Sequence, residues 1–127
     1  MMTKNKVTGN FGENCAVKHL KKKRFKIIER NHREGKYEID IIAANKTTLV
    51  FVEVKARRVE SYDEIAFDVC AASAVDADKQ KRTVCAAKAY LAQNSTQKSI
   101  RFDVIEVYLD KNNEKKLIEI NHIENAF

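Results

Sequence analysis

The chain has 127 residues, of which 44% are hydrophobic and 33% charged, a balance typical of one folded globular domain rather than of a disordered chain. No apolar run approaches the ~20 residues that a membrane span needs, and the polar N-terminus lacks the apolar core of a secretory signal. The 3 cysteines are widely spaced and form no CxxC pair, which fits a reducing compartment. We therefore expect a single domain over residues 1–127 in the cytoplasm, with no membrane partner.

The first predicted helix covers residues 12–23, with Asn10 as its N-cap. Its apolar face is formed by three residues, Ala16, Val17 and Leu20. At ~100° per residue, Glu13 points into the middle of that face. A carboxylate directed inward needs a partner, so Glu13 is a candidate functional residue.

Three strands are predicted next, over residues 25–30, 37–43 and 49–56, with polar turns at 31–35 and 45–48. The third strand is apolar on both faces, which is typical of a central strand covered from two sides. Residues 59–78 mix acids with small apolar residues and are interpreted as a loop with a short helix. A helix over 79–93, a strand over 100–109, a charged turn over 111–116 and a last strand over 117–120 complete the chain. The order α-β-β-β-α-β predicts an α/β fold with a mixed sheet flanked by helices.

The second and third strands are expected to form a hairpin that brings two acids together. A four-residue loop over 45–48 places Ala44 opposite Leu49, and the same register places Asp40 opposite Glu53. The β-carbons of directly opposed residues lie ~5 Å apart. Because side chains alternate along a strand, Glu53 and Lys55 share one face, and Asp40 falls on that face too.

Two opposed carboxylates repel each other and are costly to desolvate, and a divalent cation removes both problems. Hard oxygen ligands at this spacing suit Mg²⁺ or Mn²⁺, with the backbone carbonyl of Val54 as a further oxygen. Lys55 either helps to deprotonate a water or stabilises charge on a phosphorus centre. Glu13 completes the site, as a metal ligand or as a partner of Lys55, if its helix packs on the carboxylate face. An ordinary salt-bridged strand is the alternative, because Glu and Lys two residues apart are common.

The net charge of +6 is concentrated in clusters of Lys and Arg, for which a phosphate backbone is a natural partner. The residues expected to bind nucleic acid are Lys21, Lys22, Lys23, Arg24, Arg57, Lys79 and Arg82. A well-hydrated surface is the alternative. His19, His32 and His122 lie on separate segments without metal-ligand spacing, so surface or capping roles are expected. The sequence contains neither a phosphate-binding P-loop nor a nucleophile elbow.

Several motifs resemble those of the YraN-like uncharacterised protein family. They are GENCA at 12–16 with Leu20, IERN at 28–31, EIDII at 38–42, VFVEVKAR at 50–57, the basic helix at 79–91, RFDV at 101–104 and NAF at 125–127. The resemblance spans nearly the whole chain. It implies membership of the PD-(D/E)XK nuclease superfamily and similarity to archaeal Holliday-junction resolvases.

The resemblance implies a restriction-endonuclease-like three-layer sandwich in which Asp40 and Glu53 bind the metal, Lys55 is the catalytic lysine and Glu13 is the acid of the first helix. The implied activity is Mg²⁺- or Mn²⁺-dependent hydrolysis of phosphodiester bonds in DNA rather than RNA, including structured or branched DNA, by a homodimer. The alternatives are a nucleic-acid-binding module with weak or no catalysis and a protein-interaction domain that retains the nuclease fold. Two departures from the family pattern affect the site: Tyr37 replaces the usual glycine before Glu-Ile-Asp, and residues 59–78 lack the usual glycine.

Overall fold

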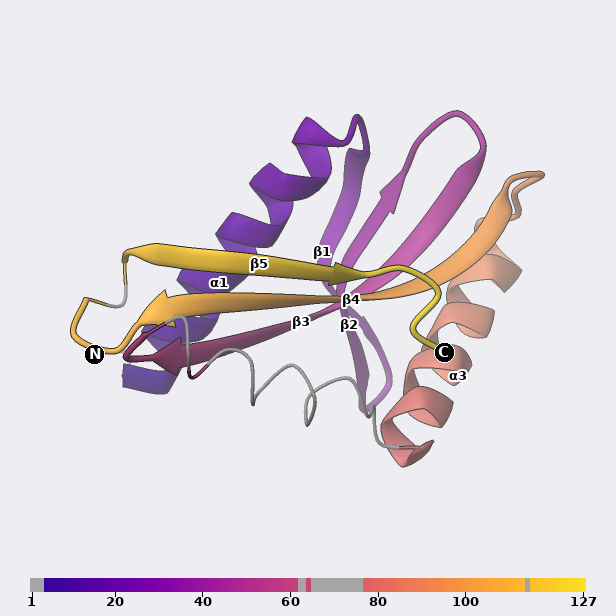
Figure 1. Ribbon diagram of the computed structural model, residues 1–127. Helices are drawn as coiled ribbons and strands as arrows, with labels where there is room; N and C mark the ends of the chain where they lie inside the picture. The colour runs from indigo at the N-terminus through magenta and orange to yellow at the C-terminus, as the bar shows by residue number, and fades with distance from the viewer. Residues whose placement is uncertain (1–3, 62–63, 65–76, 114) are drawn as a thin grey trace.

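The computed structural model describes residues 4–61, 64, 77–113 and 115–127, which form two helices packed on a five-stranded sheet (Figure 1). The helices are α1 (Lys4–Lys22) and α3 (Ala77–Gln93). The strands are β1 (Lys26–Glu34), β2 (Tyr37–Ala44), β3 (Thr48–Val59), β4 (Ser99–Asp110) and β5 (Leu117–Ile123). The predicted α/β architecture is confirmed, with the last predicted strand extended to Ile123.

The strands lie in the order β1-β2-β3-β4-β5, so neighbours in space are also neighbours in sequence. Only β3 and β4 are parallel, and the other three pairs are antiparallel. Parallel neighbours require a crossover connection, and α3 lies in the segment that joins β3 to β4. The sheet is therefore mixed, as predicted, and its longest ladder runs between two central strands.

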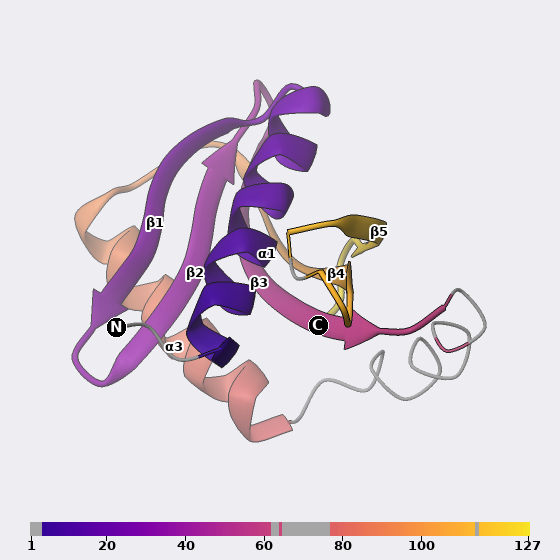
Figure 2. The same ribbon diagram turned by 90° about the vertical axis from the view of Figure 1, so that its left-hand side faces the viewer.

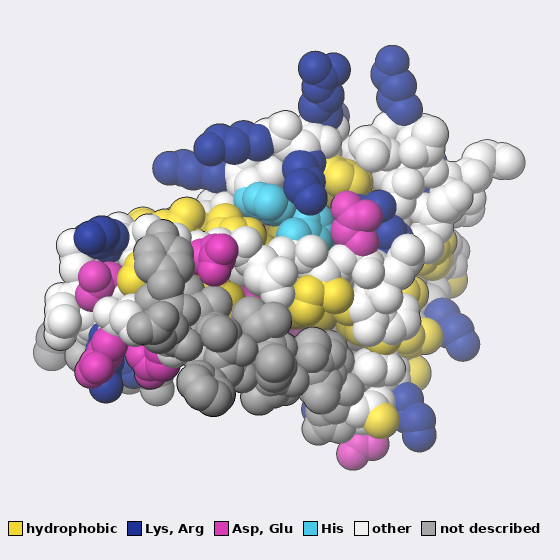
Figure 3. All heavy atoms as spheres, in the orientation of Figure 1, with side chains coloured by type: hydrophobic (Ala, Val, Ile, Leu, Met, Phe, Trp, Pro, Cys, Tyr) yellow, Lys and Arg dark blue, Asp and Glu magenta, His cyan; other side chains and the backbone are white. Residues whose placement is uncertain are grey.

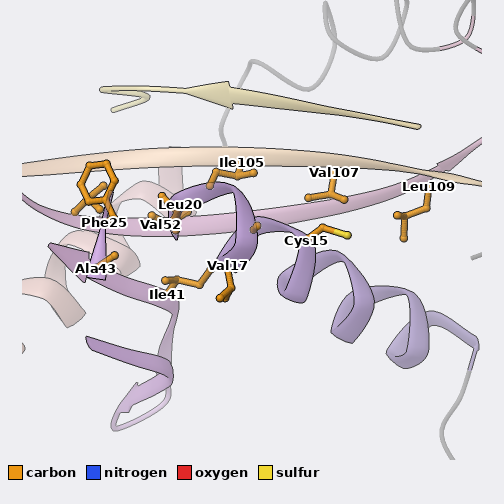
Figure 4. Packing of buried hydrophobic residues seen from close by; sticks show 12 residues of the cluster. Cys15, Val17, Leu20, Phe25, Ile41, Ala43, Val52, Ile105, Val107 and Leu109 are labelled. Atoms are coloured by element: carbon orange, nitrogen blue, oxygen red, sulfur yellow. The ribbon is translucent and has the colours of Figure 1, made fainter. Parts of the chain in front are cut away.

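The two helices cover opposite faces of the sheet, which gives three layers (Figure 2). On one face, α1 packs its apolar side against residues of β2, β3 and β4, including Ile41, Val52 and Ile105 (Figure 4). On the other face, α3 packs against Ile42 and Phe51. Consecutive residues of β2 and β3 thus enter different cores, which explains why the sequence of β3 is apolar on both sides.

Helix α1 begins at Lys4, eight residues before the predicted start, so Asn10 lies inside the helix and is not its N-cap. The predicted start was wrong because Asn10 was interpreted as an N-cap. Gly12 has a packing role instead: a β-carbon there would lie 2.7 Å from the β-carbon of Ala56. The glycine lets α1 lie directly against β3, and it fixes the position of the neighbouring Glu13.

Strand β1 continues to Glu34, so the predicted turn over residues 31–35 was wrong for most of its length. The strand pairs with β2 as far as the pair Glu34–Tyr37, and the turn is confined to residues 35–36, where Gly35 has a φ of +61°. β1 is an edge strand whose side chains are largely exposed, so its polar composition hides its strand character. The predicted loop over 59–78 lies mostly outside the described residues.

Candidate functional site

The site is centred on the place where β2 and β3 stop pairing. The register predicted from the hairpin loop is the observed one, and the ladder ends at the pair Ile41–Val52. One step further, the same register brings Asp40 to the level of Glu53. There, Asp40 Oδ2 accepts a hydrogen bond from the backbone N–H of Val54, at 2.8 Å. A carboxylate therefore occupies the point at which the strands separate.

Asp40 lines a pocket on each side of this point. The pocket toward α3 has a volume of about 300 Å³, and its lining includes Glu53, Lys79 and Arg82. The pocket toward α1 has a volume of about 260 Å³, and its lining includes Glu13. Asp40 lines both pockets, as does Glu38, and it is the less exposed of these two acids.

Glu53 is the most buried of these acids, with 5% of its surface exposed. Neither of its carboxylate oxygens accepts a hydrogen bond within the described part of the chain. Its charge is balanced by an ion pair with the ammonium of Lys79, which reaches across from the first turn of α3. Lys79 was expected to bind nucleic acid, and its partner in the structure is this buried acid.

The pKa of Asp40 is raised from 3.8 to about 6. Burial is the main cause, because it disfavours the charged form. The backbone N–H of Val54 opposes the rise, as does the charge of Lys79, whereas the negative charges of Glu53 and Glu13 add to it. The side chain lies, therefore, in a field of negative charge that one ammonium group only partly offsets.

Glu13 points inward from α1, as its position on the helix predicts, and is 9% exposed. Its Oε1 accepts hydrogen bonds from Arg30 Nε at 2.9 Å and from Asn31 Nδ2 at 3.2 Å. However, α1 covers the face opposite to the one that carries Glu53. Glu13 consequently approaches Asp40 from the other side of the sheet, and the condition that its helix packs on the face of Glu53 is not met.

Lys55 is half-buried and lines neither of the two pockets. In the β3–β4 ladder it lies beside Glu106, which is fully buried. Glu106 Oε1 accepts a hydrogen bond from Asn121 Nδ2 at 2.7 Å, and Oε2 accepts none among the described residues. Sequence reasoning missed Glu106, although an acid inside an otherwise apolar strand was a visible signal.

The residues expected to bind nucleic acid fall into separate regions. Lys79 and Arg82 line the pocket that contains Glu53, and Arg57 is half-buried on β3. Residues 21–24 lie at the C-terminal end of α1, beside the end of the sheet where the β2–β3 hairpin turns (Figure 1). Lys and Arg side chains project from this end of the molecule (Figure 3).

The histidines do not all lie apart, which corrects the expectation of separate surface or capping roles. His122 Nε2 lies 2.7 Å from Asp103 Oδ2, and His122 Nδ1 lies 3.0 Å from His19 Nε2. Asp103 is fully buried and also accepts hydrogen bonds from Nε and Nη2 of Arg101. The aspartate of the RFDV motif was a signal for this cluster. His32 lies elsewhere and pairs with two glutamates of its own strand.

The described residues offer oxygen ligands but no complete metal site. No three His, Cys, Asp or Glu side chains among them are placed as a group that could hold an ion. Asp40 and Glu53 supply hard oxygen donors, and the backbone group of Val54 that contacts Asp40 is the N–H. Cys15 and Cys85 are free thiols away from these acids. No helix in the described ranges has the length and apolar character needed to cross a membrane.

Comparisons with known proteins identify relatives of the whole chain. Residues 12–107 match the model of the uncharacterised protein family UPF0102. A UPF0102 protein of Caldanaerobacter subterraneus is 44% identical over 124 residues, which cover 96% of this chain and 95% of the relative. A UPF0102 protein of Clostridioides difficile is also 44% identical over 124 residues, covering 97% and 98%. A UPF0102 protein of Bacteroides thetaiotaomicron is 38% identical over 126 residues, covering 99% and 96%. The chain belongs to the UPF0102 family, the YraN-like family that its motifs indicated.

Proposed function

We propose that this protein is a Mg²⁺- or Mn²⁺-dependent endonuclease that hydrolyses phosphodiester bonds in DNA, including structured or branched DNA. The observation that carries the proposal is the meeting of Asp40 and Glu53 at the end of the β2–β3 ladder, with lysine and arginine side chains around the same pocket. A carboxyl group whose pKa is raised by burial and by neighbouring acids, as that of Asp40 is, is typical of functional sites. The positive rim provides the contacts that a phosphate backbone needs.

The residues present fit a divalent ion. Among the described residues, Oε2 of Glu53 is buried without a partner and Oε1 contacts only the ammonium of Lys79. Burial, together with the negative charges of Glu53 and Glu13, raises the pKa of Asp40, so a cation at this place would relieve the cost of its ionised form. Carboxylate oxygens are the donors that Mg²⁺ and Mn²⁺ prefer. Asp40 and Glu53 would hold the ion, and the ion would polarise the phosphate and lower the pKa of a water molecule at the site.

The other side chains have supporting roles in this proposal. Lys79 would leave Glu53 when the ion binds, because both cations neutralise the same carboxylate, and its ammonium would then contact a phosphate of the substrate. Arg82 in the same pocket would bind a neighbouring phosphate. Lys55 would stabilise the negative charge that develops on the phosphorus centre. Glu13 would orient the carboxylate of Asp40 electrostatically from the α1 face.

One observation favours a second function, that of a nucleic-acid-binding module with weak or no catalysis. The ammonium of Lys79 already neutralises Glu53, and the described acids do not converge as a metal-binding group. If Lys79 neutralises Glu53, the site needs no metal ion, and the other cations around the pocket can still bind phosphates. A protein-interaction domain that retains the fold is the third alternative, and it predicts no binding of nucleic acid.

The proposal is tested by incubating the purified protein with Mg²⁺ or Mn²⁺ and with linear, branched and single-stranded DNA and RNA. Cleavage is expected for DNA and is expected to fall at least 100-fold in Asp40→Asn and Glu53→Gln, because each change removes a ligand charge. Glu119→Gln is the matched control, since Glu119 is an exposed carboxylate on β5, away from both pockets. Intact substrates in every reaction with the wild-type protein would rule out the nuclease, and retained DNA binding would then support the binding module.

A further inference from the structure

Helix α1 ends, and the β2–β3 hairpin turns, at the same end of the molecule (Figure 1). A groove opens there, beyond the candidate site. We call it the hairpin-end groove. It has a volume of about 600 Å³, and its lining includes Arg24, Lys26, Lys46 and Lys98 but no carboxylate. All four of these side chains are exposed. The groove is therefore a surface of one charge sign, built from three separate parts of the chain.

The positive charges of the groove are not balanced within the described residues. Arg24, Lys26 and Lys46 have no ion-pair partner there, and the ammonium of Lys98 donates a hydrogen bond to the backbone carbonyl of Asn45 at 2.7 Å. A carbonyl oxygen accepts the bond without neutralising the charge. Four cations around one groove repel each other, and an anion in the groove would remove that repulsion.

Hydrogen bonds fix the backbone of the hairpin turn that carries part of the groove. Asn45 Oδ1 accepts hydrogen bonds from the backbone N–H groups of Thr47 and Thr48, at 3.0 and 2.8 Å, which fixes the hairpin turn. The N–H of Ser99 then bonds to the carbonyl of Thr47 at 2.9 Å, which ties the beginning of β4 to the same turn. The side chains of Lys46 and Lys98 consequently project from a fixed frame.

Arg24 occupies a backbone position that favours glycine. Helix α1 ends in a Schellman motif, in which the N–H of Phe25 bonds to the carbonyl of Leu20 and the N–H of Arg24 to that of Lys21, both at 3.0 Å. Arg24 is the left-handed residue of the motif, with a φ of 68°. Glycine adopts this conformation without steric strain, whereas arginine does not. The helix dipole does not require this arginine, because Lys21 and Lys22 already place cations in the last turn.

From these observations we infer that the hairpin-end groove binds the phosphate backbone of the nucleic acid whose cleavage is proposed above. The inference rests on the proposed function and adds a second contact surface for the same substrate. Asp40, which lines the pocket of Glu53, and Ala44, which lines the groove, both lie on strand β2. The four steps between them span about 13 Å at about 3.3 Å each. A polyanion of about four base pairs, at about 3.4 Å per pair, reaches from one surface to the other.

The test compares two triple variants that each remove three positive charges. The groove variant is Arg24→Gly/Lys26→Ala/Lys46→Ala, and the matched control is Lys111→Ala/Lys115→Ala/Lys116→Ala in the β4–β5 turn. Binding of a 20-base-pair duplex is measured by fluorescence anisotropy over a series of salt concentrations in EDTA, so that neither metal binding nor cleavage affects the result. The groove variant should bind at least tenfold more weakly, and its slope of log affinity against log salt should be shallower by about 2 to 3. The control variant should lose less affinity than the groove variant, and its salt slope should change less.

The single variant Arg24→Gly separates a role in binding from a role in folding. Relief of backbone strain should raise its urea midpoint, while its affinity for the duplex falls. Equal losses of duplex affinity in the two triple variants would overturn the inference. Polyglutamate of the same charge that binds as tightly as the duplex would also overturn it, because that result would point to an acidic protein partner. A wild-type protein that binds no duplex would contradict the nucleic-acid partner of the proposed function itself. Normal binding with no cleavage would leave the inference about the groove supported and would contradict only the nuclease.

Discussion

Replacing Asp40 by Asn should stabilise the metal-free protein at neutral pH, although Asp40 lies in the core of the proposed site. The reason is the pKa of Asp40, which is about 6 in the fold against an ordinary value of 3.8. At 1.36 kcal/mol for each tenfold change in proton affinity, this difference amounts to about 3 kcal/mol of destabilisation once the carboxylate is ionised. Asparagine carries no charge, and its side-chain oxygen is still able to accept the hydrogen bond from the N–H of Val54.

The sign of the pH dependence follows from the same values. Between pH ~4 and pH ~6 the folded chain binds more protons at Asp40 than the unfolded chain does, so the stability of the wild-type protein falls as the pH rises through this window. The Asp40→Asn protein has no carboxyl group at this position, so its stability should not fall for this reason in that pH window. Urea denaturation in EDTA should show the variant more stable by about 1 to 3 kcal/mol at pH 7.5, with the difference vanishing at pH ~3.5.

A divalent ion should remove most or all of the difference in stability between the two proteins. Mg²⁺ at 100 times its dissociation constant would stabilise the wild-type protein by about 2.7 kcal/mol, whereas Asp40→Asn should gain much less. Glu119→Gln, an exposed carboxylate change, should behave like the wild type at every pH and metal concentration. The reasoning is refuted if Asp40→Asn is no more stable than the wild type at pH 7.5 in EDTA, because the buried charge would then carry no penalty.

Three further changes test the packing and the buried cluster. Gly12→Ala should destabilise the fold by about 1 to 3 kcal/mol, because the new β-carbon would lie 2.7 Å from that of Ala56, and adding Ala56→Gly should restore most of the loss in urea denaturation. The pKa of His19 is lowered by burial and by the nearby His122, so the stability of the protein should fall as the pH drops through about 6.5. His19→Asn should flatten this part of the plot of stability against pH, and an unchanged slope in the variant would contradict the prediction. Asp103→Asn should cost on the order of 3 kcal/mol, because the partly buried guanidinium of Arg101 loses its counter-charge, and a loss below 1 kcal/mol in the same assay would contradict this.

The hairpin was the part of the site that the sequence predicted best. Alternation of apolar residues fixes which face of a strand is buried, and a short polar loop fixes the register, so the level of Asp40 relative to Glu53 followed from local rules. The two layers of helix and the mixed sheet followed from the order of the elements. These predictions needed no information about contacts between distant segments.

The parts that could not be predicted depend on tertiary contacts. Gly12 carries the usual sign of a helix boundary, and only its approach to Ala56 explains why it lies inside α1. The pairing of Lys79 with Glu53 joins residues whose separation in sequence gives no hint of contact. The same holds for His19 and His122, which meet because α1 and β5 both pack near β4. The sequence shows that most of these residues are charged or polar, but it does not show which residues they contact.

The central claim is that Asp40 and Glu53 together hold a divalent ion, and a crystal structure of the protein with Mn²⁺ tests it most directly. We predict an anomalous-scattering peak between the two carboxylates, with the ammonium of Lys79 displaced from Glu53. A map without a peak at that place, at a Mn²⁺ concentration that saturates any binding seen in solution and with Lys79 still paired to Glu53, would contradict the claim.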